Sequence, residues 1–185
     1  MVDPYLEHQR SEKVMIVDEE NNPVAPATRQ EMRQGVLWHR ASYVYIVTNE
    51  AHGKKLLVQK RTMKKDYCPG FFDLSTGGVV GEGEDDDINA VREVEEEVGI
   101  PNAALTKIKV VKCDGERSRV FANVYVLKDF DPDACPLSLQ ADEVDEVQYW
   151  SRDYIDQLVD QETTDVQITP DSVQVYKELV ADGVL

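Results

Sequence analysis

The chain has 185 residues, enough for one domain with a sizeable core and short for two, so we expect a single domain over residues 1–185. Acidic residues outnumber basic ones by 36 to 20, and the formal charge of −16 disfavours nucleic acid or anionic membranes as partners. No apolar run approaches the roughly 18 residues that span a bilayer. The three cysteines match neither a disulfide framework nor a zinc site. We therefore expect a soluble, cytoplasmic protein, and a homodimer stays open because dimers are common.

The N-terminal part of the chain predicts a hairpin followed by a short helix. The segment VMIVDEENNPVAP (14–26) has two apolar runs around an Asn-Asn-Pro turn, which is typical of a hairpin. Thr28 and Glu31 have the capping-box spacing for a helix that ends near Gly35. These elements form an extension at about residues 13–36, ahead of the main strands.

The rest of the chain alternates strands with three helices. The clearest helix covers residues 85–98, with three aspartates in its first turn and Gly99 as its stop. Ser151 can cap a short helix, and Thr169 with the proline after it opens a last helix to about Asp182. This order predicts an α/β fold, a sheet covered by helices on both faces. Strands are predicted at 41–48, 55–61, 105–113, 118–127 and 143–150.

The helix at 85–98 gathers its acidic side chains on one side. Glu93, Glu96 and Glu97 lie three or four residues apart, so their like charges should destabilise an isolated helix. A bound divalent cation would turn this repulsion into attraction, whereas a merely solvated acidic face is the alternative. Arg92, four residues before Glu96, can steady one carboxylate through a bidentate contact. The opposite arc is predicted to carry the apolar residues Ile88, Val91, Val94 and Val98.

The segment GVVGEGEDDDINAVREVEEEVGI (78–100) resembles the Nudix box. It matches the box pattern at every specified position, which makes the resemblance specific. The resemblance implies an α/β/α sandwich with a mixed β-sheet, in which a loop, a helix and a second loop bind Mg²⁺ or Mn²⁺. It also implies a hydrolase that cleaves a diphosphate bond of a nucleoside diphosphate derivative or related small molecule. In this chemistry, metal-activated water attacks phosphorus.

The same resemblance implies roles for residues in and beside the box. Glu93, Glu96 and Glu97 would be metal ligands, and Glu93 would also be a candidate base. Arg92 would orient a glutamate, and the carbonyl of Gly77 would be a further ligand.

Acids outside this set have weaker assignments. Many family members recruit an acid beyond the box as base or ligand, and the stretch ADEVDEVQYW offers Glu143 and Glu146. Solvated acids at a strand end are an equally weighted alternative for both. Glu84 lies on a different side of the helix, which suggests that it braces the loop.

The segments upstream of the box show a second resemblance. IVDEENNPVAPATRQEM, LWHRASYVYI and LLVQKRTMKKDYCPGFFD are similar in order and spacing to isopentenyl diphosphate isomerases and to YfcD-like Nudix proteins. The resemblance implies that Arg61 and Lys65 hold the substrate diphosphate, with two surface bases as the alternative. His39 matches an isomerase metal ligand, although a lone histidine at the start of a strand is more often structural.

The isomerase motif itself is missing from the start of the box. Where the isomerases carry a reactive cysteine followed by Gly-His-Pro, this chain has STGGV (75–79), and Cys68 lies too far upstream to replace that thiol. Alkene isomerisation needs a proton donor and a proton acceptor on opposite sides of the substrate. The sequence therefore favours hydrolysis. An isomerase-like enzyme and a catalytically silent nucleotide-binding module stay as alternatives.

Overall fold

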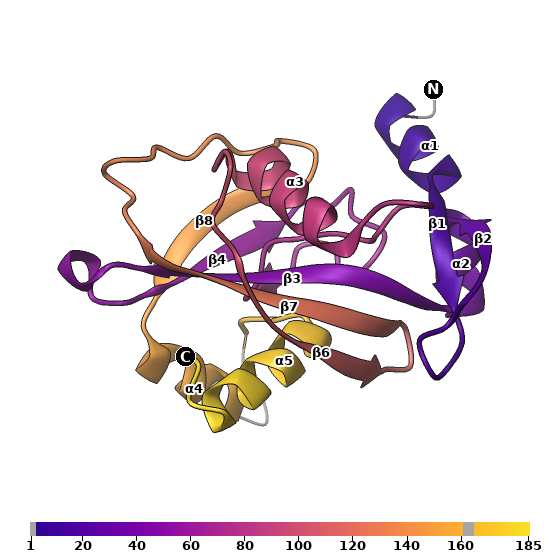
Figure 1. Ribbon diagram of the computed structural model, residues 1–185. Coiled ribbons are helices and arrows are strands. Elements are labelled where there is room, and N and C mark those ends of the chain that lie inside the picture. Colours follow the sequence, from indigo (N-terminus) through magenta and orange to yellow (C-terminus); the bar gives the residue numbers. More distant parts are fainter. Residues whose placement is uncertain (1–2, 161–164) are drawn as a thin grey trace.

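The fold is built on one mixed sheet with β3 at its centre (Figure 1). The computed structural model describes residues 3–160 and 165–185. Its strands are β1 (Lys13–Val17), β2 (Pro23–Thr28), β3 (Trp38–Thr48), β4 (Leu56–Arg61), β5 (Phe72–Asp73), β6 (Thr106–Asp114), β7 (Arg119–Phe130) and β8 (Val144–Trp150). β3 pairs antiparallel with β1 and β4 and parallel with β7. β6 extends the sheet beyond β7, while β5 and β8 both pair with β4.

Helices cover both faces of this sheet. Figure 1 shows α3 on one face, α4 and α5 on the other, and α1 and α2 beside the hairpin at one end. The predicted α/β/α sandwich with a mixed sheet is therefore confirmed. Among the described residues, no helix combines the length and apolarity needed to cross a membrane. The helices are α1 (Pro4–Ser11), α2 (Arg29–Gly35), the short η1 (Glu50–His52), α3 (Asp86–Val98), α4 (Arg152–Asp160) and α5 (Pro170–Ala181).

Side chains of β3 alternate between the two faces, which creates two apolar layers. Tyr43 and Tyr45 belong to the layer shared with α4 and α5, whereas Val44 and Ile46 belong to the layer under α3. The hydroxyl of Tyr45 also donates to the Ser172 carbonyl of α5 at 2.7 Å. Burial on both faces explains why this strand is rich in large apolar and aromatic residues.

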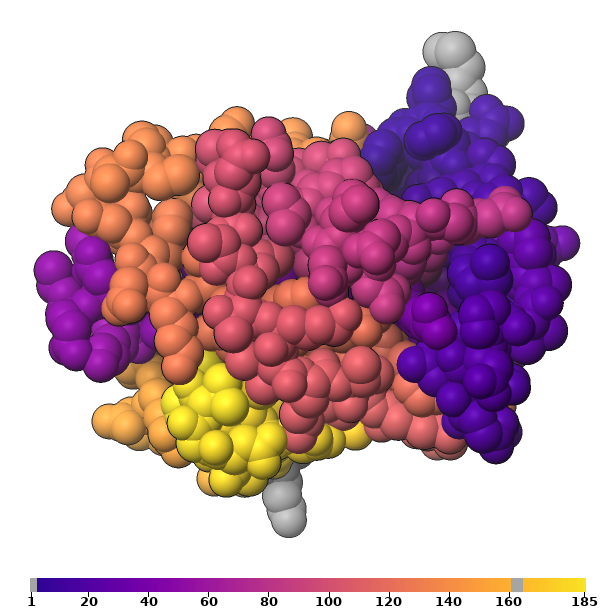
Figure 2. Space-filling model, viewed as in Figure 1, coloured from indigo at the N-terminus to yellow at the C-terminus, as the bar shows by residue number. Residues whose placement is uncertain are grey.

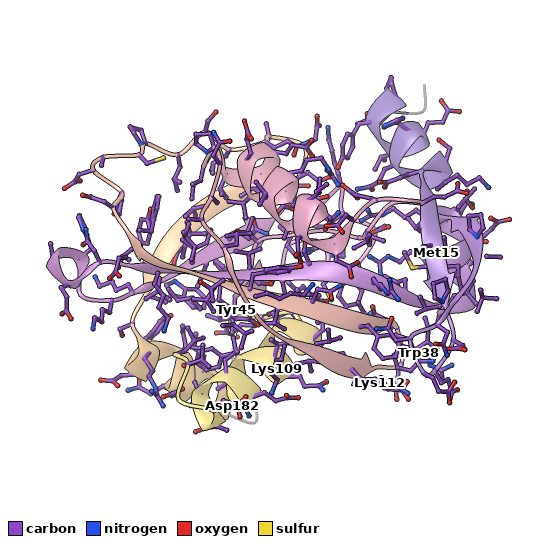
Figure 3. The ribbon with its side chains drawn as sticks, in the orientation of Figure 1. Met15, Trp38, Tyr45, Lys109, Lys112 and Asp182 are labelled. Atoms are coloured by element: carbon purple, nitrogen blue, oxygen red, sulfur yellow. The ribbon has the colours of Figure 1, made fainter. Side chains whose placement is uncertain are left out.

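Long basic side chains tie β6 to its neighbours. Lys109 Nζ lies 2.9 Å from a carboxylate oxygen of Asp182, just after α5, and Lys112 Nζ lies 4.6 Å from the centre of the Trp38 ring (Figure 3). Such side chains cover apolar surface with their stems while their charges stay at the surface. The edge of the sheet is thereby joined to the C-terminal helix.

The predicted strands and helices are all present, with ends within three residues of those expected. The capping box forms as predicted, because Glu31 N donates to Thr28 Oγ1 at 3.2 Å and Thr28 N donates to Glu31 Oε2 at 2.8 Å. The sequence did not predict α1 or β5. β5 has only two residues, and α1 is a short helix whose one marker is Asp3 as N-cap before Pro4.

The N-terminal extension packs against the segment that precedes α3. Figure 2 shows the indigo N-terminal segment closing one end of the molecule and abutting the magenta segment. Glu82 N donates to the Lys13 carbonyl at 2.9 Å, and Val14 forms an isolated bridge with Gly81. The loop that leads into α3 is therefore joined to β1.

Candidate active site

Helix α3 is oriented by a buried polar residue. Asp85 caps its first turn, and Asn89 accepts a hydrogen bond from Ser42 Oγ at 2.7 Å and donates to the Val79 carbonyl at 3.2 Å. These bonds draw Asn89 to the sheet, where it is fully buried. Ile88 is consequently 64% exposed, so its prediction as part of the apolar arc was wrong. A polar side chain with complete hydrogen bonds has taken the buried place expected for an apolar one.

Glu97 is the most enclosed acid of the helix. It is 1% exposed and accepts hydrogen bonds from Gly77 N at 3.0 Å and from Gln59 Nε2 at 3.1 Å. Lys65 Nζ lies 3.5 Å from its other carboxylate oxygen. The backbone at Gly77 has a φ of 149°, and a Cβ there would lie 2.1 Å from the Ser42 carbonyl oxygen. Only glycine allows this close approach of the loop to β3.

Glu93 lies one turn before Glu97 and faces the same loop. A Cβ on Gly78 would come within 2.5 Å of the Glu93 carboxylate carbon, so the absent side chain leaves room for this acid. Burial raises the pKa of Glu93, and the charge of Glu97 raises it further. Two close carboxylates at the edge of a loop supply the oxygen ligands that Mg²⁺ prefers. This donor set fits a hard divalent cation.

Arg92 organises the outer side of the helix. Its guanidinium lies 2.9 Å from Glu93 Oε1, 2.6 Å from Glu96 Oε2 and 2.8 Å from Glu84 Oε1. Glu84 also accepts from Gly81 N at 3.0 Å, which holds the loop before α3 in place. The Glu96 side chain is 49% exposed and turns toward Arg92. The structure thus separates Glu96 from the more enclosed pair formed by Glu93 and Glu97.

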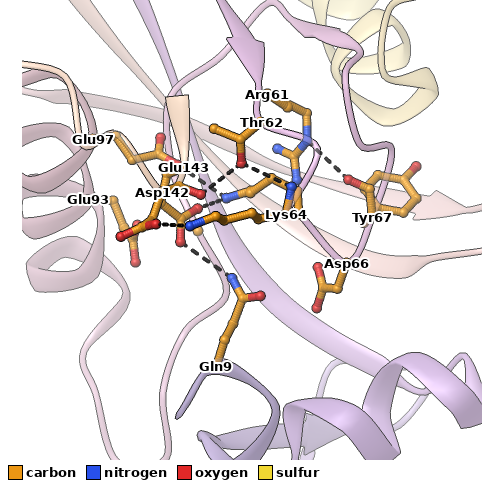
Figure 4. Close-up of polar contacts among 12 residues, drawn as sticks. Gln9, Arg61, Thr62, Lys64, Asp66, Tyr67, Glu93, Glu97, Asp142 and Glu143 are labelled. Carbon is orange, nitrogen blue, oxygen red and sulfur yellow. Dashed lines mark hydrogen bonds and ion pairs between the residues drawn. The ribbon is translucent and has the colours of Figure 1, made fainter. Parts of the chain in front are cut away.

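Glu143 lies opposite the helix, whereas Glu146 does not. Figure 4 shows Glu93 and Glu97 on α3 facing Glu143, which precedes β8. One oxygen of Glu143 contacts Lys65 Nζ, and the other contacts the hydroxyl of Tyr5 on α1. Burial raises the pKa of Glu143 to about 7. Glu146 is exposed on β8 and accepts from Gln148 Nε2, so it lies outside this cluster.

Arg61 and Lys65 are buried at one side of the same site. Arg61 donates to Asp73 Oδ2 at 3.2 Å and to the Tyr67 carbonyl at 3.1 Å. Burial lowers the pKa of Lys65, and the neighbouring charge of Arg61 lowers it further. Both side chains line a small cavity of about 50 Å³ together with the Gly77 and Gly78 loop. The structure therefore brings the predicted phosphate contacts and the predicted metal loop to one cavity.

Helix α2 adds two more bases to this cavity. Arg29 and Arg33 both line it, at 2.8 Å and 3.3 Å from Asp66 Oδ2. Burial raises the pKa of Asp66, yet the two guanidinium groups outweigh burial and hold this pKa below its ordinary value.

A larger cavity of about 600 Å³ lies elsewhere, at strand ends near the C-terminal residues, and other side chains line it.

His39 is a buried neutral side chain. Its Nδ1 donates to the Leu37 carbonyl at 3.0 Å, and burial, with the charge of Arg33 as the next cause, lowers its pKa to about 3. It lines the basic cavity.

One group of three potential metal ligands, whose atoms all lie within 4.8 Å of one another, occurs among the described residues. This group lies away from the candidate active site. That group consists of His52, Asp131 and Asp133.

Several residues of the site were not predicted from the sequence. Gln59 stands in the strand LLVQKR as a polar residue among apolar ones, which could have indicated a buried hydrogen-bonding role. Arg29 and Arg33 share a helix face by their spacing, but their proximity to the box depends on the fold. Tyr5 and Gln9 lie in α1, for which the sequence predicted no structure.

The comparisons with known proteins identify the family of the chain. The NUDIX domain family matches residues 37–171. An uncharacterised Nudix hydrolase of Yersinia pestis is 40% identical over 163 residues, covering 88% of this chain and 82% of that protein. The uncharacterised Nudix hydrolase YfcD of Escherichia coli K12 is 38% identical over 164 residues, covering 89% and 84%.

Solved structures show the same fold. DR0079 of Deinococcus radiodurans superposes with a TM-score of 0.70 at 18% identity, covering 90% of this chain and 98% of that one. The NUDIX domain of Shewanella oneidensis NrtR, crystallised with ADP-ribose, gives 0.60 at 14% identity, covering 78% and 88%. With the family match and these relatives, the chain belongs to the Nudix hydrolase family, whose members act on pyrophosphate bonds.

Proposed function

We propose that the chain is a divalent-metal-dependent enzyme that hydrolyses a diphosphate bond in a nucleoside diphosphate derivative or a related small molecule. The observation that carries this proposal is the meeting of Glu97 and Glu143 at the Lys65 ammonium, with Glu93 beside them, next to a cavity lined by bases. Carboxylates can bind a divalent cation, and basic side chains can bind phosphate. The residues for metal binding and for substrate binding therefore lie together.

Glu93 and Glu97 would hold the metal, with Glu96 and the Gly77 carbonyl as the further ligands implied by the box. When bound, Mg²⁺ or Mn²⁺ would supply positive charge that lowers the pKa of water and neutralises charge developing at phosphorus. Arg92 pairs with Glu93 and Glu96 and would orient the Glu93 carboxylate toward the metal. The enclosed position of Glu97 keeps solvent away from one side of the site.

Glu143 is the proposed proton acceptor. Because burial raises its pKa to about 7, its carboxylate can take a proton from the attacking water near neutral pH and release it afterwards. Glu93, whose pKa burial also raises, is the candidate for this step within the box. Glu146 is exposed on β8, which supports its alternative interpretation as a solvated strand acid.

The bases around the cavity would hold the phosphates of the substrate. Arg61 and Lys65 lie on one side, and Arg29 and Arg33 contribute from α2. A diphosphate brings negative charge into a chain whose formal charge is −16, so local bases have to compensate for it. The acidic remainder of the chain disfavours nucleic acid and anionic membranes, which supports a small-molecule substrate.

Phosphorus NMR after incubation with Mg²⁺ tests the proposal. The panel contains ADP-ribose, which was crystallised with the Shewanella NUDIX domain, together with dinucleoside polyphosphates, coenzyme A and isopentenyl diphosphate. We expect cleavage of at least one compound at its diphosphate, with no turnover after removal of the metal and with turnover lowered about 1,000-fold in the Glu97→Gln variant. The product phosphates identify the bond that is broken.

Other outcomes favour the alternatives. Conversion of isopentenyl diphosphate with no cleavage of the panel would favour an isomerase, despite the absent cysteine. Binding of a nucleotide with no turnover of any compound would favour a silent binding module.

A further inference from the structure

Helix α1 is held against the site at both ends. At its start, the Asp3 carboxylate lies 3.2 Å from Lys64 Nζ, and that ammonium lies 5.9 Å from the centre of the Tyr5 ring. After its last turn, the Glu12 carbonyl accepts from Arg29 N at 2.8 Å, which joins α1 to α2. These contacts fix the helix in the fold although it lies outside residues 37–171, the region matched by the family.

One face of α1 reaches Glu143. Tyr5 and Gln9 are four residues apart and therefore share a face of the helix. The Tyr5 hydroxyl contacts Glu143 Oε1, and Gln9 Nε2 lies 3.1 Å from that hydroxyl and 3.4 Å from the same carboxylate oxygen. Gln9 is only 7% exposed. A glutamine buried on a helix that is otherwise largely exposed indicates a specific polar role.

We infer that Tyr5 and Gln9 are positioning residues for Glu143, and that α1 is a wall of the active site. The inference rests on the proposed function, in which Glu143 accepts a proton. Because α1 holds Oε1, the Glu143 carboxylate keeps one orientation, in which Oε2 contacts Lys65 Nζ. The same Lys65 Nζ lies 3.5 Å from Glu97 Oε1. Fixing a base in this way preserves the geometry for reaction, since small misplacements cost much of the rate.

Tyr5→Phe removes the hydroxyl and keeps the ring. We expect kcat with the cleaved panel compound and Mg²⁺ to fall about tenfold while KM stays within about twofold, because only the orientation of the base changes. If Tyr5 acts through Glu143, the double variant with Glu143→Gln should be as slow as Glu143→Gln alone. Tyr154→Phe, which removes an exposed hydroxyl on α4 across the sheet, is the matched control and should match the unchanged protein.

The outcomes separate this inference from the proposed function. Full activity of Tyr5→Phe beside an inactive Glu143→Gln would overturn the inference alone, as would multiplying losses in the double variant. Full activity of Glu143→Gln would overturn the proton-accepting role and the inference with it.

Crystal structures of the unchanged protein and of Tyr5→Phe provide a second readout that needs no substrate. A Glu143 carboxylate that bonds Tyr5 in the first and takes another orientation in the second supports the inference. An identical Glu143 in both would overturn it.

Discussion

The inner and outer sides of α3 carry the same acidic residue type in different surroundings. On the inner side, Glu97 is 1% exposed and receives hydrogen bonds from the backbone of Gly77 and from Gln59. On the outer side, the neighbouring Glu96 is half exposed and pairs with Arg92 of the same helix. Helical spacing alone groups the two, but contacts from other elements separate them. Comparing them shows that contacts from other elements, more than the place of a carboxylate in a motif, set its exposure and its bonding partners.

The largest expected effect is a difference between two matched amide variants. Glu97→Gln should lower kcat/KM about 1,000-fold, because it removes a buried carboxylate at the proposed metal position, whereas Glu96→Gln should lower it about tenfold. Steady-state kinetics at saturating Mg²⁺ give both values, and urea unfolding of each variant checks that the fold is retained. Equal losses would mean that Glu96 turns inward on binding the metal, which would break the comparison between the two sides.

Local patterns predicted most of the fold. Alternating faces, a capping box and Gly99 identify elements through interactions between near neighbours in sequence. The exposed Ile88 was mispredicted because the buried hydrogen bonds of Asn89 come from β3 and the preceding loop, which periodicity does not reveal. α1 was missed because eight residues with a weak apolar pattern give no reliable helical signal.

The site was predictable only where its residues follow a motif. The box spacing named Glu93, Glu97 and Arg92, and the structure brings them together, although their assigned roles stay predictions. The contacts of Glu143 with Lys65 and Tyr5 join residues far apart in the sequence, and no local spacing encodes them. Residues that act through tertiary contacts therefore required the structure.

A second pair of variants compares a glycine beside the inner side of α3 with a glycine far from it. Gly78→Ala places a Cβ 2.5 Å from the Glu93 carboxylate carbon, at the far end of a flexible side chain that can move aside. We expect kcat/KM to fall about 100-fold, because a displacement of about 1 Å would move the Glu93 carboxylate out of its alignment with Glu97. The free energy of unfolding should change by less than about 1 kcal/mol.

The matched control is Gly53→Ala, in the turn after η1. Gly53 has a φ of 77°, and the nearest atom to an added Cβ is the Lys55 side chain at 3.9 Å. Alanine in this left-handed conformation should cost about 1–2 kcal/mol of stability and leave the rate unchanged. Chemical denaturation and steady-state kinetics should thus rank the two alanines in opposite orders. Full activity of the Gly78→Ala variant would mean that the position of the Glu93 carboxylate does not matter for the reaction.

The smallest expected effect is on stability and concerns two histidines, one buried and one exposed. The pKa of His39 is about 3 in the folded protein against 6.5 for the ordinary side chain, because the buried ring is costly to charge. The unfolded chain therefore binds a proton first as the pH falls, so the contribution of His39 to stability is full above about pH 6.5 and declines below it. His39→Asn should reduce the slope of unfolding free energy between pH 6.5 and 5 by up to about 1.4 kcal/mol per pH unit. Urea unfolding at several pH values measures this slope, and His8→Asn, at an exposed position on α1, is the matched substitution against which it is compared. Identical slopes for the unchanged protein and His39→Asn would mean that His39 takes up its proton in the folded state, which would require a carboxylate or water beside its ring.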